Sequence, residues 1–218
     1  MSIKKNIRDI RQELPKNITL IAASKTRSVD EIKQAAEAGI RIIGENYVQE
    51  AEKKYSELKG KVKFHLIGHL QKNKAKKAVE IFDMIQTVDS LDIAKEINKR
   101  CQDIKKIMPV LIEVNSGKEP NKNGVMPEHA ENLIREISSL KNINVKGLMT
   151  MAPYFDDPEK DRPYFRLTKT LFEKIKALNI PNTDIKILSM GMSHSYKTAI
   201  EEGANMVRIG TRIFGSRQ

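Results

Sequence analysis

The chain has 218 residues and a formal net charge of +11, with 39% hydrophobic and 31% charged side chains. This composition provides material for a hydrophobic core and excludes a disordered chain, and a single cysteine, Cys101, excludes an internal disulfide framework and fits a reducing compartment. No apolar run approaches the roughly 20 residues of a membrane-spanning helix, and the first segment lacks the apolar stretch of a secretory signal, so we expect a cytoplasmic protein with no membrane partner.

Short apolar runs alternate with helical patterns along the whole chain. In chain order, the patterns predict a helix over residues 1–14, a strand over 19–25, a helix over 28–38, a strand over 40–46, a helix over 47–58, a strand over 63–68, a helix over 73–81 and a strand over 83–89. They then predict a helix over 91–101, a strand over 109–115, a helix over 127–140, a strand over 145–151, a helix over 158–178, a strand over 186–191, a helix over 193–202 and a strand over 206–211. The strand runs are apolar nearly throughout, which is typical of parallel strands covered on both faces.

Local signals mark several helix ends. Ser28 is a favoured N-cap residue, Glu31 follows three positions later as in a capping box, and Gly39 suits the end of the same helix. Pro127 suits the first turn of a later helix. Cys101 lies within a predicted helix, where we expect a buried and inert thiol.

Eight strands separated by helices within about 200 residues predict an α/β fold, a single (β/α)₈ barrel of the TIM type that comprises residues 1–218 as one domain. Only seven residues follow the last predicted strand, too few for an eighth outer helix, so we expect the extra N-terminal helix to cover that gap. A doubly wound open sheet is the alternative, but the sequence has no glycine-rich dinucleotide turn.

Lys25 is the most informative candidate site residue. It ends the apolar run AASK, and in a barrel the working residues lie at the carboxyl ends of the strands. An ammonium group in a poorly solvated barrel mouth loses hydration, which favours the neutral amine that attacks aldehydes. The alternative is a lysine that only ends the strand and extends into solvent.

Residues after the last two strands indicate an anion site. Ser189 and Ser193 flank a glycine before a helix predicted to begin near Ser193, where free N–H groups favour a phosphate. Gly210 and Thr211 end the last strand, and glycine lets an anion approach the backbone closely. Barrels frequently bind phosphate at these two loops, so together with the lysine they predict a pocket for a phosphorylated aldehyde.

Arg208 and the histidines are weaker signals. Arg208 shares the strand face of Gly210 and is expected to point inward, where it binds the ligand or forms an ion pair with a carboxylate such as Glu45. The spacing of His65 and His69 does not favour a metal site, and His65 is expected to be a hydrogen-bonded wall residue. No role is assigned to His194.

Basic residues are scattered along the chain and follow one another most closely at Lys72, Lys74, Lys76 and Lys77. We interpret this run as a solvated helix face, because aromatic residues make up only 5% of the chain and none interleave with these lysines as stacking platforms. Nucleic acid is therefore not expected as a partner.

Six motifs resemble one known family. The segments AASKTRSVDEI, IGENYVQE, FHLIGHLQKNKAK, GLMTMAP, LSMGMS and MVRIGTRIFG are similar, in this order, to the pyridoxal 5′-phosphate (PLP) homeostasis protein family, also called the YggS family. The resemblance implies a barrel similar to the N-terminal domain of alanine racemase, with PLP as cofactor. It implies cofactor contacts from Lys25, Asn46, Ser189, Ser193, Arg208, Gly210 and Thr211.

The resemblance also implies a role for each contact. Lys25 forms a Schiff base with the cofactor, Arg208 lies near the pyridine nitrogen, and Asn46 lies beside the ring. The serines, the glycine and the threonine hold the phosphate. Where the family carries an acidic residue two positions after the motif GMS, this sequence has Ser195, which puts the capping of the following helix in doubt.

The resemblance implies a non-catalytic carrier or buffer of PLP inside the cell, expected to be a monomer, with apo forms of PLP enzymes as candidate recipients. The alternative is a PLP-dependent amino-acid racemase. Racemisation needs a base on each face of the substrate α-carbon, and no residue besides Lys25 is identified for this role. Tyr47, Tyr154 and Tyr196 are candidates that the sequence does not place.

Overall fold

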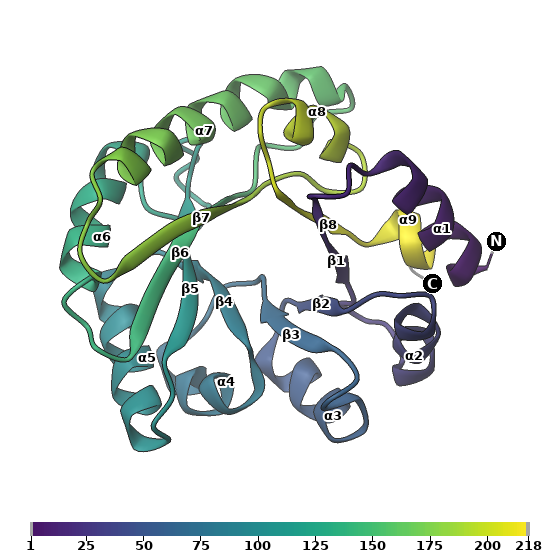
Figure 1. The fold of residues 1–218 in the computed structure, drawn as a ribbon, viewed down its shortest axis with the longest axis horizontal. Coiled ribbons are helices and arrows are strands. Elements are labelled where there is room, and N and C mark those ends of the chain that lie inside the picture. Colours follow the sequence, from purple (N-terminus) through teal and green to yellow (C-terminus); the bar gives the residue numbers. More distant parts are fainter. Residues whose placement is uncertain (1, 217–218) are drawn as a thin grey trace.

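A computed structural model describes residues 2–216. Eight parallel strands close into a barrel in sequence order, because β1 pairs with both β2 and β8 (Figure 1). The strands are β1 (Thr19–Ala23), β2 (Ile42–Glu45), β3 (Lys63–Leu66), β4 (Met84–Val88), β5 (Met108–Val114), β6 (Ile143–Thr150), β7 (Thr183–Ser189) and β8 (Met206–Ile209). The predicted (β/α)₈ barrel is confirmed.

Helices surround the barrel and connect consecutive strands (Figure 1). The α-helices are α1 (Ile3–Glu13), α2 (Val29–Glu37), α3 (Val48–Leu58), α4 (Ala75–Ile81), α5 (Leu91–Asp103), α6 (Ala130–Ile137), α7 (Arg162–Ala177), α8 (Tyr196–Glu201) and α9 (Thr211–Phe214). Three short 3₁₀ helices, η1 (Lys72–Lys74), η2 (Pro127–His129) and η3 (Pro158–Asp161), precede α4, α6 and α7. The first turns of three predicted helices are therefore 3₁₀ turns, which are frequent at helix N-termini.

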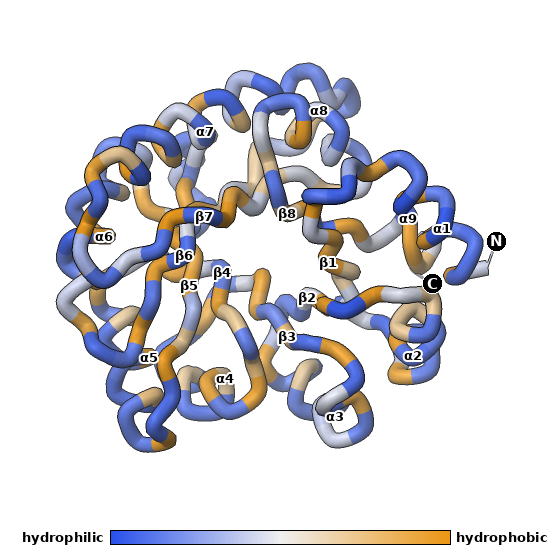
Figure 2. The backbone as a smooth tube through the Cα atoms, in the orientation of Figure 1, coloured by the Kyte–Doolittle hydropathy of each residue, from blue (hydrophilic) through white to orange (hydrophobic). Residues whose placement is uncertain are grey.

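Apolar residues recur along the strands and on the helix sides that face them, whereas outer turns are hydrophilic (Figure 2). Inside the barrel, Met84, Leu111 and Met149 form a separate apolar cluster. Residues two positions further along a strand point to the same face, so the next interior layer toward the carboxyl ends includes Gln86 and Glu113. That layer is polar, and it forms the floor of the site.

The N-terminal helix covers the gap in the outer ring, as predicted. Helix α1 lies beside α9 (Figure 1), and the side-chain amide of Asn6 donates to the carbonyl of Ile213 at 2.9 Å. After β8 the chain forms a single helical turn, α9, of four residues, which agrees with the expectation that too few residues remain for a full outer helix. Residue 1 of the predicted first helix lies outside the described residues.

Local predictions at two other helices have different outcomes. The capping box of α2 is confirmed, because Ser28 accepts from the backbone of Glu31 and the Glu31 side chain accepts from the backbone of Ser28. The helix predicted to begin near Ser193 begins instead at Tyr196, with Ser195 at the N-cap position and no side-chain cap bond. Ser193 thus lies in a loop, where its hydroxyl is free to meet the end of β8.

Candidate functional site

A cavity of about 500 Å³ lies at the carboxyl ends of the strands, where the predicted residues converge. Six of the seven predicted contacts line it, namely Lys25, Asn46, Ser193, Arg208, Gly210 and Thr211. Met151, Tyr154, Met192 and His194 contribute to the remaining wall. The cavity therefore has a basic and hydrogen-bonding side toward β1 and β8 and a more apolar side toward β6.

Lys25 presents a primary amine that protein acids do not engage. Its side chain is half-buried, and its Nζ lies 5.6 Å from the ring centroid of Tyr47, within cation–π range. The acids on neighbouring segments bond to other cations: Glu31 to Arg27, and Glu45 and Glu50 to Lys54. Within residues 2–216 the amine is thus left for a ligand.

A buried network fixes the strand end that carries Lys25. Lys54 Nζ donates to the carbonyl of Ser24 at 3.0 Å and to Glu45 Oε1 at 2.8 Å, and Ser24 Oγ donates to the same carboxylate oxygen at 2.6 Å. Burial raises the pKa of Glu45, while the adjacent Lys54 ammonium lowers it. The turn after Lys25 is therefore held by polar groups buried behind the cavity.

The backbone beside Lys25 is strained. Thr26 has φ of +64°, a left-handed conformation that β-branched residues rarely adopt. Its N–H donates to Glu50 Oε2 at 3.0 Å, so helix α3 holds the turn in place. Sequence reasoning missed Glu50 and Lys54, because their spacing on an amphipathic helix is the same as that of solvated surface charges. Backbone strain of this kind clusters at binding sites, where the surrounding structure enforces it.

The loops after β7 and β8 meet on the other side of the cavity. The N–H of Gly210 donates to Ser193 Oγ at 3.1 Å, which joins the two loops directly. Helix α9 begins at Thr211, and the N–H groups of a first helical turn have no partner four residues earlier. A Cβ at Gly210 would lie 3.2 Å from the carbonyl oxygen of Ala23, so glycine keeps this approach open. Hydroxyl and N–H donors therefore point to one region.

Ser189 is placed differently from the expectation that it contacts a phosphate. It is fully buried beneath the cavity, where its hydroxyl donates to Gln86 Oε1 at 2.8 Å and accepts from Arg208 Nη1 at 2.6 Å. Gln86 Nε2 in turn lies 3.0 Å from His65 Nδ1. Burial lowers the pKa of His65 to about 3, so the ring is neutral and Nδ1 accepts this bond. The prediction of a hydrogen-bonded His65 is confirmed.

Arg208 is held inward as predicted, and its hydrogen bonds go to Ser189 and Thr150, not to Glu45 as in the alternative of an ion pair. Its Nη2 donates to the carbonyl of Thr150 at 2.8 Å, and Ser189 receives the other bond. Burial lowers its pKa to about 10, so the guanidinium remains charged at neutral pH. The carboxylate of Glu113 opposes this shift, because its Coulombic interaction with the guanidinium raises the pKa of Arg208. A buried, charged and oriented donor therefore forms part of the cavity floor.

His194 and Ser195 anchor the loop after β7 to the start of α7. His194 Nε2 lies 3.3 Å from Asp161 Oδ2, and the ring packs against Tyr154 with centroids 5.1 Å apart. Burial raises the pKa of Asp161, while hydrogen bonds from Ser195 and His194 lower it. Ser195, which stands where the resemblance implied an acid, is buried and lowers the pKa of Asp161.

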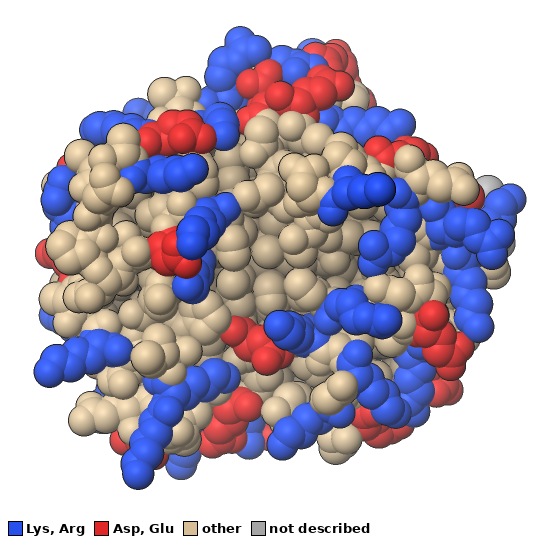
Figure 3. Space-filling view, viewed as in Figure 1, with Lys and Arg blue, Asp and Glu red and all other residues tan. Residues whose placement is uncertain are grey.

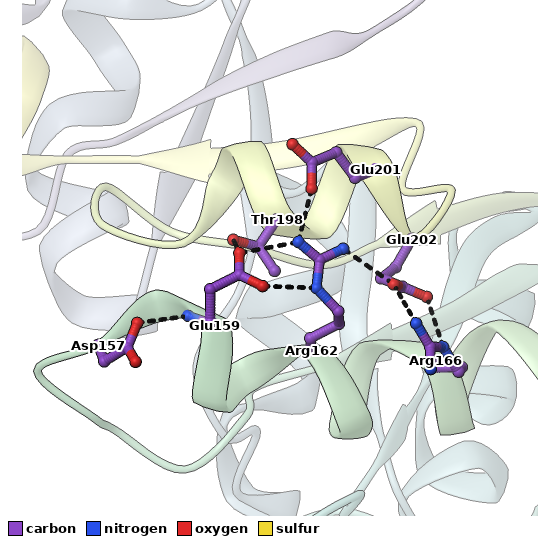
Figure 4. Close-up of polar contacts among 7 residues, drawn as sticks. All are labelled: Asp157, Glu159, Arg162, Arg166, Thr198, Glu201 and Glu202. Atoms are coloured by element: carbon purple, nitrogen blue, oxygen red, sulfur yellow. Dashed lines mark hydrogen bonds and ion pairs between the residues drawn. The ribbon is translucent and has the colours of Figure 1, made fainter.

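An arginine-centred network fixes α8 against α7 (Figure 4). Arg162 donates to Glu159, Glu201 and Glu202, and Arg166 donates twice to Glu202 (Figure 4). Several bonded charges in a network hold geometry better than isolated surface pairs. Because α8 directly follows the loop that carries Ser193, this network supports that side of the cavity from outside.

Charged side chains of both signs are spread over the face of the barrel that Figure 3 shows. In the basic run, Lys72 pairs with Asp92 and Lys77 pairs with Glu52 and Glu80. Two of the four lysines of the run, Lys72 and Lys77, thus have acidic partners on the surface.

Three further features concern metal ligands, membrane-spanning helices and the single thiol. In residues 2–216, no group of three or more His, Cys, Asp or Glu side chains is arranged to hold a metal ion. Within the same range, no helix has both the length and the apolar character needed to cross a bilayer. Cys101 is buried in α5 as predicted, and burial raises the pKa of its thiol to about 11.

Comparison with known sequences gives consistent matches over the full chain. The family model for the N-terminal domain of alanine racemase matches residues 1–218. The pyridoxal phosphate homeostasis protein of Aquifex aeolicus is 43% identical over 200 residues, which cover 91% of this chain and 87% of that protein. The protein of the same name from Homo sapiens is 38% identical over 212 residues, covering 91% of this chain and 76% of the human protein.

Solved structures of similar shape include a cofactor complex. The structure of PipY from Synechococcus elongatus with PLP bound has a TM-score of 0.90 at 33% identity, covering 98% of this chain and 100% of PipY. An alanine racemase from Clostridium difficile has a TM-score of 0.81 at 18% identity, covering 99% of this chain but 56% of the racemase. The second likeness concerns the fold alone.

Proposed function

This chain belongs to the family of pyridoxal phosphate homeostasis proteins, and on that premise we propose that it binds PLP and carries or buffers it inside the cell without catalytic turnover of its own. The cofactor assignment rests on the family and on the PLP complex of PipY. The proposed contacts rest on the geometry of this chain.

One observation carries the proposal: a free primary amine and two anion-binding loops face the same cavity of about 500 Å³. In the proposed complex, Lys25 Nζ attacks the aldehyde carbon, a C=N bond forms, and the aldehyde oxygen leaves as water. Ser193 and Thr211 donate to the phosphate, and Gly210, whose N–H donates to Ser193 Oγ, lets the phosphate approach the backbone closely. The volume lies in the range of small-ligand cavities, so size and donor chemistry both fit the cofactor.

The floor of the cavity suits retention of the cofactor more than catalysis. A PLP ring bound through Lys25 acts as an electron sink when its pyridine nitrogen is protonated. In our proposal Arg208, charged at neutral pH, donates a hydrogen bond to that nitrogen and keeps it unprotonated. Ser189 keeps this guanidinium in position from below, through the bond at 2.6 Å, instead of contacting the phosphate. Asn46 lies beside the ring.

Removing two hydroxyls tests the proposed phosphate contacts. The double variant Ser193→Ala, Thr211→Val is expected to bind PLP about ten- to a hundredfold more weakly, because each hydroxyl bond to a charged group contributes about 1.5 kcal/mol or somewhat less when partly exposed. Equilibrium titration followed by visible absorbance measures the change. Ser56→Ala, an exposed hydroxyl on α3, is the control and should retain wild-type affinity. An unchanged dissociation constant in the double variant would contradict these contacts.

A transfer experiment distinguishes the carrier from the racemase. PLP-loaded protein is mixed with an apo PLP enzyme, and recovery of enzyme activity is compared with that from the same concentration of free PLP. In parallel, a panel of amino acids is incubated in D₂O. We expect activation of the apo enzyme and no Cα deuteration above background. Rapid, Lys25-dependent deuteration would instead favour a racemase, with Tyr154 as the candidate opposing base because it lines the cavity.

We further propose that the chain acts as a cytoplasmic monomer and that apo PLP enzymes are its recipients. The large exposed apolar side chains are spread over four segments, with Ile104 and Ile107 in one loop and Tyr47, Tyr154 and Leu178 elsewhere, which supports a chain without a stable partner. The free thiol of Cys101 fits a reducing compartment. Sedimentation of the purified protein at several concentrations measures the oligomeric state directly.

A further inference from the structure

A second cavity, of about 310 Å³, adjoins the Lys25 cavity at the barrel mouth. Met151, Tyr154 and Met192 line both cavities and form the wall between them. We call the second cavity the Glu113 pocket, because Glu113 lines it together with Asn115, Asn121 and Asn123. None of these four residues has a part in the cofactor contacts proposed above.

Glu113 is a buried carboxylate whose side chain lines the pocket. Its side chain follows Leu111 on the interior face of β5, and only 3% of the residue is exposed. Within residues 2–216, its Oε2 has no hydrogen-bond partner. A buried polar atom without a partner is rare in folded proteins and requires an explanation.

The cations near Glu113 are committed to other groups. Arg208 donates to Ser189 and to the carbonyl of Thr150, and Lys122 pairs with Glu119 at 2.6 Å. Burial and the nearby Asp89 raise the pKa of Glu113 to about 7, against the opposing influence of Arg208. A carboxylate so poorly compensated gains from a positive partner that enters from outside the protein.

The outer wall of the pocket is organised before any ligand binds. Asn115 Nδ2 donates to the carbonyl of Glu119 at 2.9 Å, and its Oδ1 accepts from the N–H of the same residue at 3.1 Å. Gly124 closes the loop with φ of +108°, where a Cβ would lie 2.7 Å from the backbone nitrogen of Asn115. The loop that carries Asn121 and Asn123 is thereby tied to the end of β5.

We propose that the Glu113 pocket binds a free amino acid, with the ammonium group on the Glu113 carboxylate and the amino-acid carboxylate toward the exposed amides of Asn121 and Asn123. The volume of about 310 Å³ is near the lower limit for small-ligand sites and suits a molecule of this size. The pocket is lined by one buried acid, by exposed amides and by the side chains of Met151 and Met192. This site adjoins the Lys25 cavity and does not require the cofactor.

The test uses PLP-free wild-type protein labelled with ¹⁵N and titrated with L-alanine or with L-lactate, which replaces the ammonium group by a hydroxyl. We expect saturable shifts of backbone amides around Glu113 with L-alanine and at least about tenfold weaker binding of L-lactate, since a charge-assisted bond is about twice as strong as a neutral one. Glu113→Gln, which has nearly the same shape without the charge, should weaken L-alanine binding about ten- to a hundredfold.

Glu136→Gln, which removes an exposed carboxylate on α6, is the matched control and should bind L-alanine like the wild type. Equal binding of alanine and lactate, or unchanged affinity in Glu113→Gln, would overturn the proposal, as would the absence of saturable alanine binding. The comparison of the two ligands on wild-type protein needs no variant to fold. Because the titration is made without PLP, its failure leaves the cofactor proposal untouched, and loss of PLP binding leaves this one untouched.

Discussion

Replacing Lys25 with alanine is expected to abolish the Schiff base and with it the yellow colour of the PLP-loaded protein. The phosphate contacts remain in this variant, so some reversible binding persists, but the affinity should fall at least about a hundredfold, equivalent to about 2.7 kcal/mol. Visible absorbance after dialysis measures retention. Borohydride reduction followed by peptide mass analysis locates the attachment, and we expect the pyridoxyl increment on the peptide that contains Lys25.

Two matched variants separate the amine from charge alone. Lys25→Arg keeps a cation at the cavity wall but cannot form the imine, because a guanidinium stays protonated in proteins. It should therefore lose the reducible adduct as completely as alanine does. Lys76→Ala removes an exposed lysine on α4 and should retain both colour and adduct. A pyridoxyl increment at another lysine, with normal retention in Lys25→Ala, would refute the attachment.

Lys25 was predictable from the sequence because its position is unusual for its chemistry. A charged residue at the end of an apolar run has few structural explanations. In a barrel of this type, the carboxyl ends of the strands form the functional face. The loops after β7 and β8 were predictable for a related reason, since Ser193, Gly210 and Thr211 are small or hydroxylated residues at strand ends, and all three line the cavity. Local sequence and global fold point to the same place in these cases.

Ser189 shows what the sequence alone does not determine. The local sequence around a serine at the end of a strand is the same whether its side chain points into the barrel interior or belongs to the following loop. The pairing across the barrel, with Ser189 opposite Met206, brings it under Arg208 two residues further along β8. Glu113 was missed for the same reason, because its interior position follows from the register of eight strands and not from its neighbours.

The groups that hold the turn after Lys25 could not be predicted from sequence patterns either. Glu50 and Lys54 are spaced like solvated helix charges, yet one bonds the strained turn at Thr26 and the other lies buried between β1 and β2. The predicted start of α8 was wrong by three residues, because serine is a favoured N-cap residue and Ser193 therefore suits the beginning of the helix. In the folded chain that hydroxyl accepts instead from Gly210, a partner 17 residues away.

The substitution Gly147→Ala is expected to destabilise the barrel strongly, although it adds only one methyl group. Gly147 has φ of +150°, and a Cβ at this position would lie 1.8 Å from the carbonyl oxygen of Ile187 on the neighbouring strand. The strand pairing shifts register at this point on both sides of β6, so neither β5 nor β7 can move away independently. We expect a loss of at least about 4 kcal/mol in the free energy of unfolding, measured by urea denaturation.

Gly60→Ala is the control that isolates this clash from backbone conformation. Gly60 also has a positive φ, +80°, but a Cβ there would meet no atom within 4 Å, so the cost should be only about 1 kcal/mol. Equal costs in the two variants would show that β6 yields to the added methyl group. In that case, the carbonyl of Thr150 and the side chain of Met151 would shift as well, and PLP affinity should fall. If the Gly147→Ala protein keeps both its stability and its PLP affinity, the pairing of β6 with β5 and β7 does not position the cavity floor.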